Sequence, residues 1–283
     1  MKQEIRKHKI RKHKKSFDIF LSVITYGAAA IAMSILTFLI AYIVIKGLPN
    51  MRLSLFSLTY TSENVSVIPA LITTIQMTFF SLIIAVPLGV FTAIYLVEYA
   101  KRGNKLVGVI RVTAETLSGI PSIVYGLFGL LFFVSALGWG FSLIAGAFTL
   151  SIMILPLIMR TTEEALKSVP DSYREGSFGL GAGRLRTVFR IVLPAAIPGI
   201  LSGIILAIGR IVGETAALIY TAGTVAQTPQ HVTDSARTLA VHMYALSSEG
   251  LHTDAAYATA LILLIMVIGI NALASYVAKK LTR

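Results

Sequence analysis

Long stretches of the chain lack charged residues, and this pattern predicts its elements. The uncharged stretches lie between Asp18 and Lys46, Glu63 and Glu98, Glu115 and Arg160, and Asp254 and Lys279. A helix that crosses a bilayer needs about 20 mostly apolar residues, so the third stretch is long enough for two. We predict six helices, at residues 19–46, 68–98, 108–135, 141–160, 196–221 and 256–278.

Two of these predicted helices need comment. The third stretch is divided at Leu137–Gly140, where two glycines favour a turn and Trp139 suits a membrane interface. The second helix is longer than one span requires, so its start near Pro69 either lies along the surface or is tilted. The chain is thus predicted to be an all-α integral membrane protein with six transmembrane helices.

Composition supports this class. Of the 283 residues, 55% are hydrophobic and 13% are charged, whereas a soluble protein carries roughly 25% charged residues. The apolar run after the basic N-terminus is nearly twice as long as that of a signal peptide, which predicts an uncleaved first helix.

The distribution of lysine and arginine predicts the orientation. Eight of the first fifteen residues are basic, and further basic residues follow the second, fourth and sixth helices, whereas the opposite side has only Lys46, Arg52 and Arg237. Cytoplasmic loops are enriched in these residues, so both termini are predicted to be cytoplasmic. Residues 1–18 form a basic cytoplasmic segment, and residues 19–283 form a single transmembrane domain. The net charge of +12 then indicates contact with anionic lipid rather than nucleic acid.

Known catalytic patterns are missing from the sequence. It contains no cysteine, no Walker A glycine loop, and no pair of histidines at metal-ligand spacing on a predicted span. We therefore expect a transporter subunit rather than an enzyme, without a cofactor of its own, whose energy comes from a partner or a gradient.

The cytoplasmic segment at residues 168–194 predicts two short helices. Ser172 with Glu175, or alternatively Ser168 with Asp171, is spaced as a capping box that begins the first helix.

Two glycines divide this segment. Gly181 and Gly183 can end the first helix in left-handed geometry. A second, amphipathic helix then places three apolar residues on one side: Val188, Ile191 and Val192.

A pair of charges lies inside the fifth predicted helix. Arg210 would lie about 20 Å from the cytoplasmic edge, where a charge marks a function by default. Glu214 follows it at i, i+4 and would share its helix face. The planar fork of arginine suits an oxyanion. We hypothesise that Glu214 neutralises Arg210 while the pathway is empty; the alternative is a structural ion pair.

Arg111 and Glu115 have the same spacing at the start of the third predicted helix. Arg111 would lie only about 10 Å from the cytoplasmic edge and can snorkel to water. The pair is either structural or part of a cytoplasmic exit gate.

The segment at 168–194 resembles the EAA loop of ABC-importer permeases, written E-A-A-x3-G-x9-I-x-L-P. The corresponding positions are Glu175, Gly176, Ser177, Gly181, Ile191, Leu193 and Pro194. Gly176 and Ser177 replace the two alanines with other small residues. The resemblance implies that this segment is a coupling helix that docks in a groove of an ATPase subunit.

Two further stretches, Gly209–Thr224 and Gly119–Gly129, resemble the signature of the phosphate-importer permeases. The later run His242–Gly250, with Ala256–Ala260, resembles the PstA family among them. The resemblance implies the type I importer fold and a pathway for inorganic phosphate lined by Arg210 and Glu214.

The same resemblance implies a set of partners. These are a second, PstC-like permease subunit, a PstB-like ATPase dimer that binds ATP and Mg, and a PstS-like extracytoplasmic phosphate-binding protein. It places the chain in the bacterial inner membrane. The alternatives are a permease for another oxyanion, such as sulfate, molybdate or phosphonate, and a secondary transporter, which has no use for a coupling loop.

Overall fold

The computed structural model describes the backbone of residues 2–101 and 103–281 and the side chains of residues 20–101 and 103–280. All regular structure in these residues is helical. The long helices are α1 (Lys2–Gly47), α2 (Ile68–Ile94), α5 (Leu143–Lys167), α8 (Leu193–Val212) and α11 (Thr253–Leu281).

Shorter elements connect them. These are η1 (Leu48–Asn50), η2 (Leu53–Phe56), η3 (Tyr95–Tyr99), α3 (Lys105–Ser118), α4 (Ser122–Gly129), η4 (Leu130–Ala136), α6 (Asp171–Gly179), α7 (Arg184–Thr187), η5 (Val188–Val192), α9 (Ala216–Ile219) and α10 (Leu239–Glu249). Of these, η1 and η2 are 3₁₀ helices, and η3, η4 and η5 are π-helical turns that continue a longer helix.

Five helical segments of the described residues are long and apolar enough to cross a membrane, or six if the bent α3–α4 pair is one span. The predicted helices at 68–98 and 256–278 are confirmed by α2 with η3 and by α11. The predicted helix at 141–160 continues to Lys167, because the added residues have no helix breaker among them. The helix predicted to begin at residue 19 begins at Lys2 instead.

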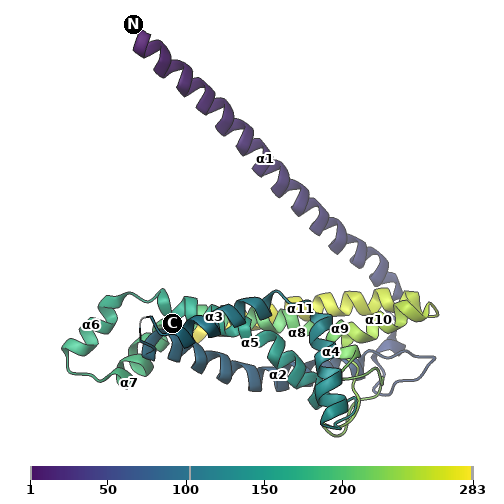
Figure 1. Cartoon of the computed structure of the whole chain (residues 1–283). Coiled ribbons are helices and arrows are strands. Elements are labelled where there is room, and N and C mark those ends of the chain that lie inside the picture. Colours follow the sequence, from purple (N-terminus) through teal and green to yellow (C-terminus); the bar gives the residue numbers. More distant parts are fainter. Residues whose placement is uncertain (1, 102, 282–283) are drawn as a thin grey trace.

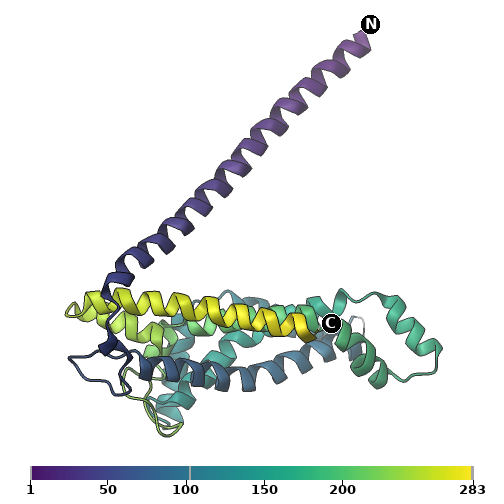
Figure 2. The ribbon, with the colours of Figure 1, turned by 180° about the vertical axis from the view of Figure 1, so that it is seen from behind.

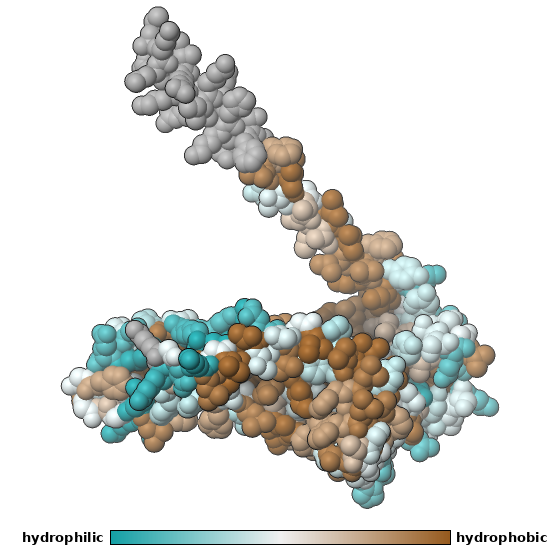
Figure 3. Space-filling view, viewed as in Figure 1, coloured by the Kyte–Doolittle hydropathy of each residue, from teal (hydrophilic) through white to brown (hydrophobic). Residues whose placement is uncertain are grey.

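The body of the molecule is a bundle of nearly parallel helices built around α5 (Figure 1). Helix α2 packs along α5, α5 packs on α8, and α11 packs on α8. Leu150, Met153 and Ile154 of α5 are fully buried at the centre of the core. Apolar side chains also dominate the middle of the outer surface, between more polar ends (Figure 3). Lipid solvates such a surface, whereas helices satisfy their backbone groups internally.

Helix α1 stands away from this body, as both ribbon views show (Figures 1 and 2). Its most apolar 18-residue window has no buried residue. Among the residues whose side chains the structure describes, α1 contacts the body at its C-terminal end, where the Tyr42 and Tyr257 hydroxyls lie 3.3 Å apart. A Cβ atom added at Gly47 would lie 2.8 Å from Leu261 Cβ, so this close approach to α11 requires glycine.

The continuous helix predicted at 108–135 is wrong. Helices α3 and α4 meet at an angle of 103°. Pro121 explains the break, because its ring disfavours helical geometry in the residue before it. The Tyr125 hydroxyl donates to the Leu117 carbonyl at 2.7 Å, beside the Ile120 N–H that donates to the same oxygen at 3.1 Å. This side chain therefore joins the start of α4 to the end of α3.

The helix predicted at 196–221 is also interrupted. Helix α8 ends at Val212 with Gly213 as its C-cap, and α9 begins only at Ala216. The bend places α9 against α4, where a Cβ added at Gly126 would lie 2.8 Å from Ala217 Cα. Two of the stretches that carry the family resemblance therefore pack directly on each other.

Candidate functional site

Arg210 lies in the last turn of α8 and faces two hollows of the surface. One is a cavity of about 510 Å³ between α3, α5 and α8. The other, of about 650 Å³, is lined by Leu157 of α5, Ser202 of α8 and Asn271 of α11, among others. Over the described ranges, no carboxylate lies within ion-pair distance of this guanidinium.

Glu214 is separated from Arg210 by the end of α8. The prediction that the two share a helix face is wrong, because Gly213 ends the helix and breaks the i, i+4 register. The buried carboxylate accepts instead from the Ala217 backbone N–H at 3.0 Å. Glu214 therefore stabilises the start of α9, where a negative charge is favourable.

Arg111 finds its partner on another helix. Its Nη2 lies 2.7 Å from Oε1 of Glu163 in α5, and the Lys167 Nζ lies 2.6 Å from the same oxygen. The Glu163 side chain is 8% exposed, against 44% for Arg111 and 53% for Lys167. A single buried carboxylate thus partly neutralises both cations. From the i, i+4 spacing, the expected partner of Arg111 was Glu115 instead.

The cavity of about 510 Å³ brings three of the four predicted pathway residues together. Arg111, Glu115 and Arg210 all line it, whereas Glu214 does not. Its other charged residues are Arg160, Glu163, Glu164 and Lys167 of α5. Four cations thus face three carboxylates.

The charged side chains of this cavity differ in the ion pairs they form. Glu163 pairs with both Arg111 and Lys167, and Arg160 makes an exposed pair of 3.3 Å with Glu164. Arg210 remains as the cation without a carboxylate among the residues that the structure describes. Such an arginine can offer its planar fork to an incoming oxyanion.

The segment 168–194 forms the predicted pair of short helices at one end of the bundle, as α6 and as α7 with η5 (Figure 1). Gly181 has the predicted left-handed backbone, with φ of +81°. Gly183 does not, since its φ is −74° and it begins α7 instead. Neither predicted capping box forms, because Pro170 stands at the N-cap of α6 and no side chain caps it.

The residues of the EAA-like pattern are distributed between the surface and the inside of this segment. Glu175, Gly176 and Gly181 are exposed, as is Pro194 at the start of α8; Ile191 and Leu193 are half-buried. Ser177 is buried, and its hydroxyl lies 2.8 Å from that of Thr187. This contact ties α6 to α7 and explains why a small polar residue occupies the position.

The carboxylates that organise both regions, Glu163 and Glu98, were not predicted from the sequence. Glu163 lies four residues before Lys167, a spacing that signals an ion pair on a helix. Glu98, which pairs with Arg174 at 2.7 Å, gave no such signal, because its partner is distant in the sequence.

These features define a class. A bundle of apolar helices, a cavity lined by charges and a short helical pair at one end form a multi-pass membrane permease. The chain belongs to the family of binding-protein-dependent transport system inner membrane components, whose profile matches residues 85–283. It is therefore a permease component of the bacterial inner membrane and not a catalytic subunit.

Relatives are found among phosphate permeases and other ABC permeases. The chain is 38% identical to the ABC transporter permease YqgI of Bacillus subtilis over 80% of this chain and 82% of that protein. It is 45% identical to the phosphate transport system permease PstA 1 of Mycobacterium tuberculosis H37Rv, over 50% of this chain and 45% of that protein. For PstA of Yersinia pestis, identity is 38% over 63% and 61% of the two chains. The matches thus span about half to four fifths of these relatives.

Solved structures confirm the fold of type I ABC importer permeases. A chain of the inward-facing MetNI methionine ABC transporter has a TM-score of 0.60 and 23% identity, over 77% of this chain and 94% of that one. A chain of a bacterial alginate ABC transporter has a TM-score of 0.67 and 16% identity, over 90% and 94%.

Proposed function

We propose that this chain is one of two permease subunits of an ABC importer that carries inorganic phosphate into the cytoplasm. The observation that carries the proposal is Arg210, a cation that lines two hollows of the transmembrane body without a carboxylate partner in the described part of the chain. Its fork matches two oxygens of a phosphate group. The identity to PstA permeases supports phosphate as the oxyanion.

The remaining charges suit transient binding. Arg111 and Lys167 lie in the same cavity as Arg210, but Glu163 already engages both. An anion released by Arg210 therefore meets cations that are partly neutralised, which keeps it from being held tightly. Glu115 adds a further negative charge to this cavity. We assign the cavity to the route between Arg210 and the cytoplasm.

The energy for transport comes from partners in this proposal. A PstB-like ATPase dimer binds ATP and Mg, and it docks on residues 168–194. A PstC-like permease completes the pathway, and a PstS-like binding protein delivers phosphate from outside. The exposed side chains of Glu175 and Tyr173 on α6 are available for the ATPase contact.

The test is labelled-phosphate uptake by phosphate-starved cells that lack this gene. The cells are complemented with wild type, Arg210→Gln, Arg210→Lys or the control Arg52→Gln, and membrane levels are matched. A hydrogen bond to a charged group contributes about 1.5–3 kcal/mol, so Arg210→Gln should lower uptake about 10- to 100-fold. Arg210→Lys keeps the charge but not the fork and should recover only part of it. Arg52, on η1–η2 at the opposite end, should be dispensable.

Every other outcome would contradict a specific part of the proposed function. Normal uptake by Arg210→Gln would place substrate recognition elsewhere and make Arg210 structural. Uptake that does not depend on the gene would exclude phosphate, and competition with sulfate, molybdate and phosphonate would then identify the oxyanion. Uptake that persists without ATP but collapses with the ion gradient would indicate a secondary transporter.

A further inference from the structure

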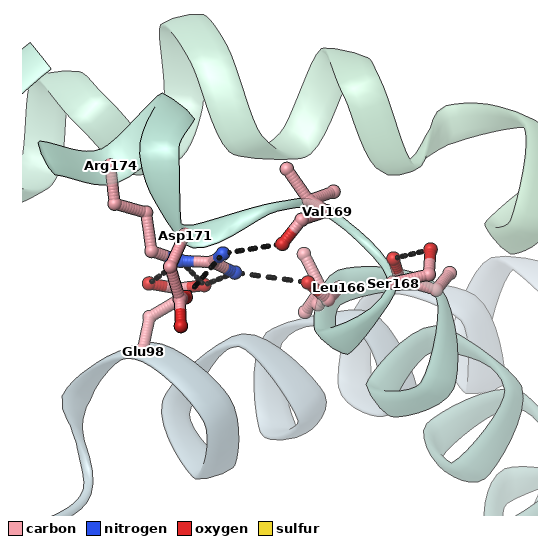
Figure 4. A network of polar contacts seen from close by, with 7 residues as sticks. Glu98, Leu166, Ser168, Val169, Asp171 and Arg174 are labelled. Carbon is pink, nitrogen blue, oxygen red and sulfur yellow. Dashed lines mark hydrogen bonds and ion pairs between the residues drawn. The ribbon is translucent and has the colours of Figure 1, made fainter. Parts of the chain in front are cut away.

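A partly buried ion pair fixes the EAA-like segment to the end of α2 (Figure 4). Arg174 of α6 donates from Nη2 to Glu98 Oε1 at 2.7 Å and from Nε to the same oxygen at 3.1 Å. The side chains are 15% and 8% exposed. A pair of this kind depends on its geometry, because both charges are largely shielded from water.

The same guanidinium holds the end of α5. Arg174 donates from Nη1 to the Val169 carbonyl at 2.8 Å and from Nη2 to the Leu166 carbonyl at 2.9 Å. Its contact with Asp171 is longer, at 3.3 Å, and that carboxylate is 83% exposed. Arg174 therefore joins α6 to the last turns of two long helices, α2 and α5, and its donors are occupied (Figure 4).

A neighbouring contact reinforces this attachment. Glu98 and Tyr99 are consecutive residues of the π-helical turn η3, and the Arg184 guanidinium lies over the Tyr99 ring, 5.8 Å from its centre. Arg184 begins α7. Both helices of the segment are thus attached to the same turn at the end of α2, α6 through an ion pair and α7 through a cation–π contact.

The turn η3 is connected to the cavity through packed helices. Helix α2 packs on α5, and Glu163 and Lys167, at the end of α5, line the cavity with Arg111. A displacement of α6 that preserves the Glu98–Arg174 pair must carry α2 and the end of α5 with it. A displacement that breaks the pair leaves a largely shielded charge without its partner.

We propose that Glu98 and Arg174 are positioning residues that make the EAA-like segment and α2 one rigid unit, so that motion of a docked ATPase reaches the transmembrane pathway. The inference rests on the proposed function, in that it assumes an ATP-driven permease. Neither residue touches the transported anion. Their loss should therefore leave ATP hydrolysis in place while separating it from transport.

The first experiment measures ATP hydrolysis and phosphate uptake in parallel, on the purified complete transporter in proteoliposomes. Glu98→Gln and Arg174→Lys are compared with Asp171→Asn, which removes the exposed carboxylate from the same guanidinium. Coupling between two sites typically changes an affinity 5- to 150-fold. We therefore expect Glu98→Gln and Arg174→Lys to hydrolyse about tenfold more ATP per transported phosphate than the wild type. Asp171→Asn should keep the wild-type ratio, because exposed ion pairs contribute little.

The double variant Glu98→Gln/Arg174→Gln tests whether the two residues act together. If the pair is one unit, the double variant should be no worse than either single one. Independent, additive effects would overturn the inference, as would a wild-type ratio of ATP to phosphate in Glu98→Gln.

A second experiment does not depend on the transported substrate. Because this chain has no cysteine, spin labels can be placed at Phe178→Cys on α6 and Phe91→Cys on α2, which are 47% and 60% exposed, with any cysteines of the partner subunits replaced. In the otherwise wild-type complex the distance between the labels should stay narrow and unchanged when ATP is added. In Glu98→Gln it should broaden or shift with ATP.

The two experiments distinguish failure of the proposed function from failure of this inference. If the wild-type complex moves no phosphate, the proposed function fails, and the label distances still decide the inference. If the distances change with ATP in the wild type as much as in Glu98→Gln, the pair does not join α6 to α2, whatever the substrate is.

Discussion

Charge in the cavity is organised around one residue, Glu163, rather than around neighbours on a single helix. Its buried carboxylate forms ion pairs with Arg111 on α3 and with Lys167 on its own helix. Glu115, at the expected i, i+4 position from Arg111, remains exposed. Helical spacing shows which charges share a face, but packing decides which carboxylate is buried beside a cation. A buried carboxylate attracts the cation more strongly, because water screens it less.

This difference predicts unequal effects on stability. Glu163→Gln leaves Arg111 and Lys167 without a counter-ion and should lower the free energy of unfolding by about 1–3 kcal/mol. Glu115→Gln, on the same cavity but exposed, should change it by less than about 0.5 kcal/mol. Thermal unfolding of the purified variants in one detergent provides the comparison. Equal midpoints would show that Glu163 does not hold α3 to α5.

At the scale of elements, the sequence predicts where helices lie better than where they break. The uncharged runs located α2 and α11 within a few residues, because a long apolar run has no other stable state in lipid than a helix. The breaks at Pro121 and Gly213 were not predicted. Both involve side chains that bond to the backbone at the break: Tyr125 donates to the Leu117 carbonyl, and Glu214 accepts from the Ala217 N–H. Such contacts exist only once the chain is folded.

The two breaks bring α4 against α9, and this crossing depends on the size of one residue. A Cβ atom added at Gly126 would lie 2.8 Å from Ala217 Cα and 3.2 Å from its carbonyl oxygen. Backbone cannot move aside as a side chain can, so Gly126→Ala should cost about 1–3 kcal/mol through overpacking. Gly108→Ala is the matched control, because open space surrounds Gly108 on α3 and alanine favours the helix by up to about 1 kcal/mol.

The measurement for this pair is the fraction of folded protein after heating, read by size-exclusion chromatography in detergent. Gly126→Ala should lose folded protein at a lower temperature than wild type, and Gly108→Ala at the same or a higher one. If Gly126→Ala is as stable as wild type, the close crossing of α4 and α9 is not present in the protein.

At the scale of the whole molecule, the two ends of the bundle differ. Helices α6 and α7 lie at one end, and α10 with the loops around it lies at the other (Figures 1 and 2). The start of α5 belongs to the second end, since the Leu143 N–H donates to the Asp234 carbonyl at 2.9 Å. The excess of lysine and arginine in the 167–190 region predicts that the α6–α7 end is cytoplasmic. Whether the bent α3–α4 pair crosses the membrane decides the number of crossings, and with it whether the two termini lie on the same side.

Cysteine labelling of spheroplasts tests both together, because the chain has no cysteine of its own. If α3 and α4 with η4 form one bent span, Lys101 and Leu137, which flank them, lie on opposite sides of the membrane. A membrane-impermeant maleimide should then label Leu137→Cys and the 80% exposed Leu251→Cys in intact spheroplasts. Lys101→Cys and the 91% exposed Leu180→Cys should react only after permeabilisation. Labelling of Leu137→Cys from the cytoplasmic side alone would make the pair re-entrant. The remaining five spans would then place the two termini on opposite sides, against the prediction from the basic residues.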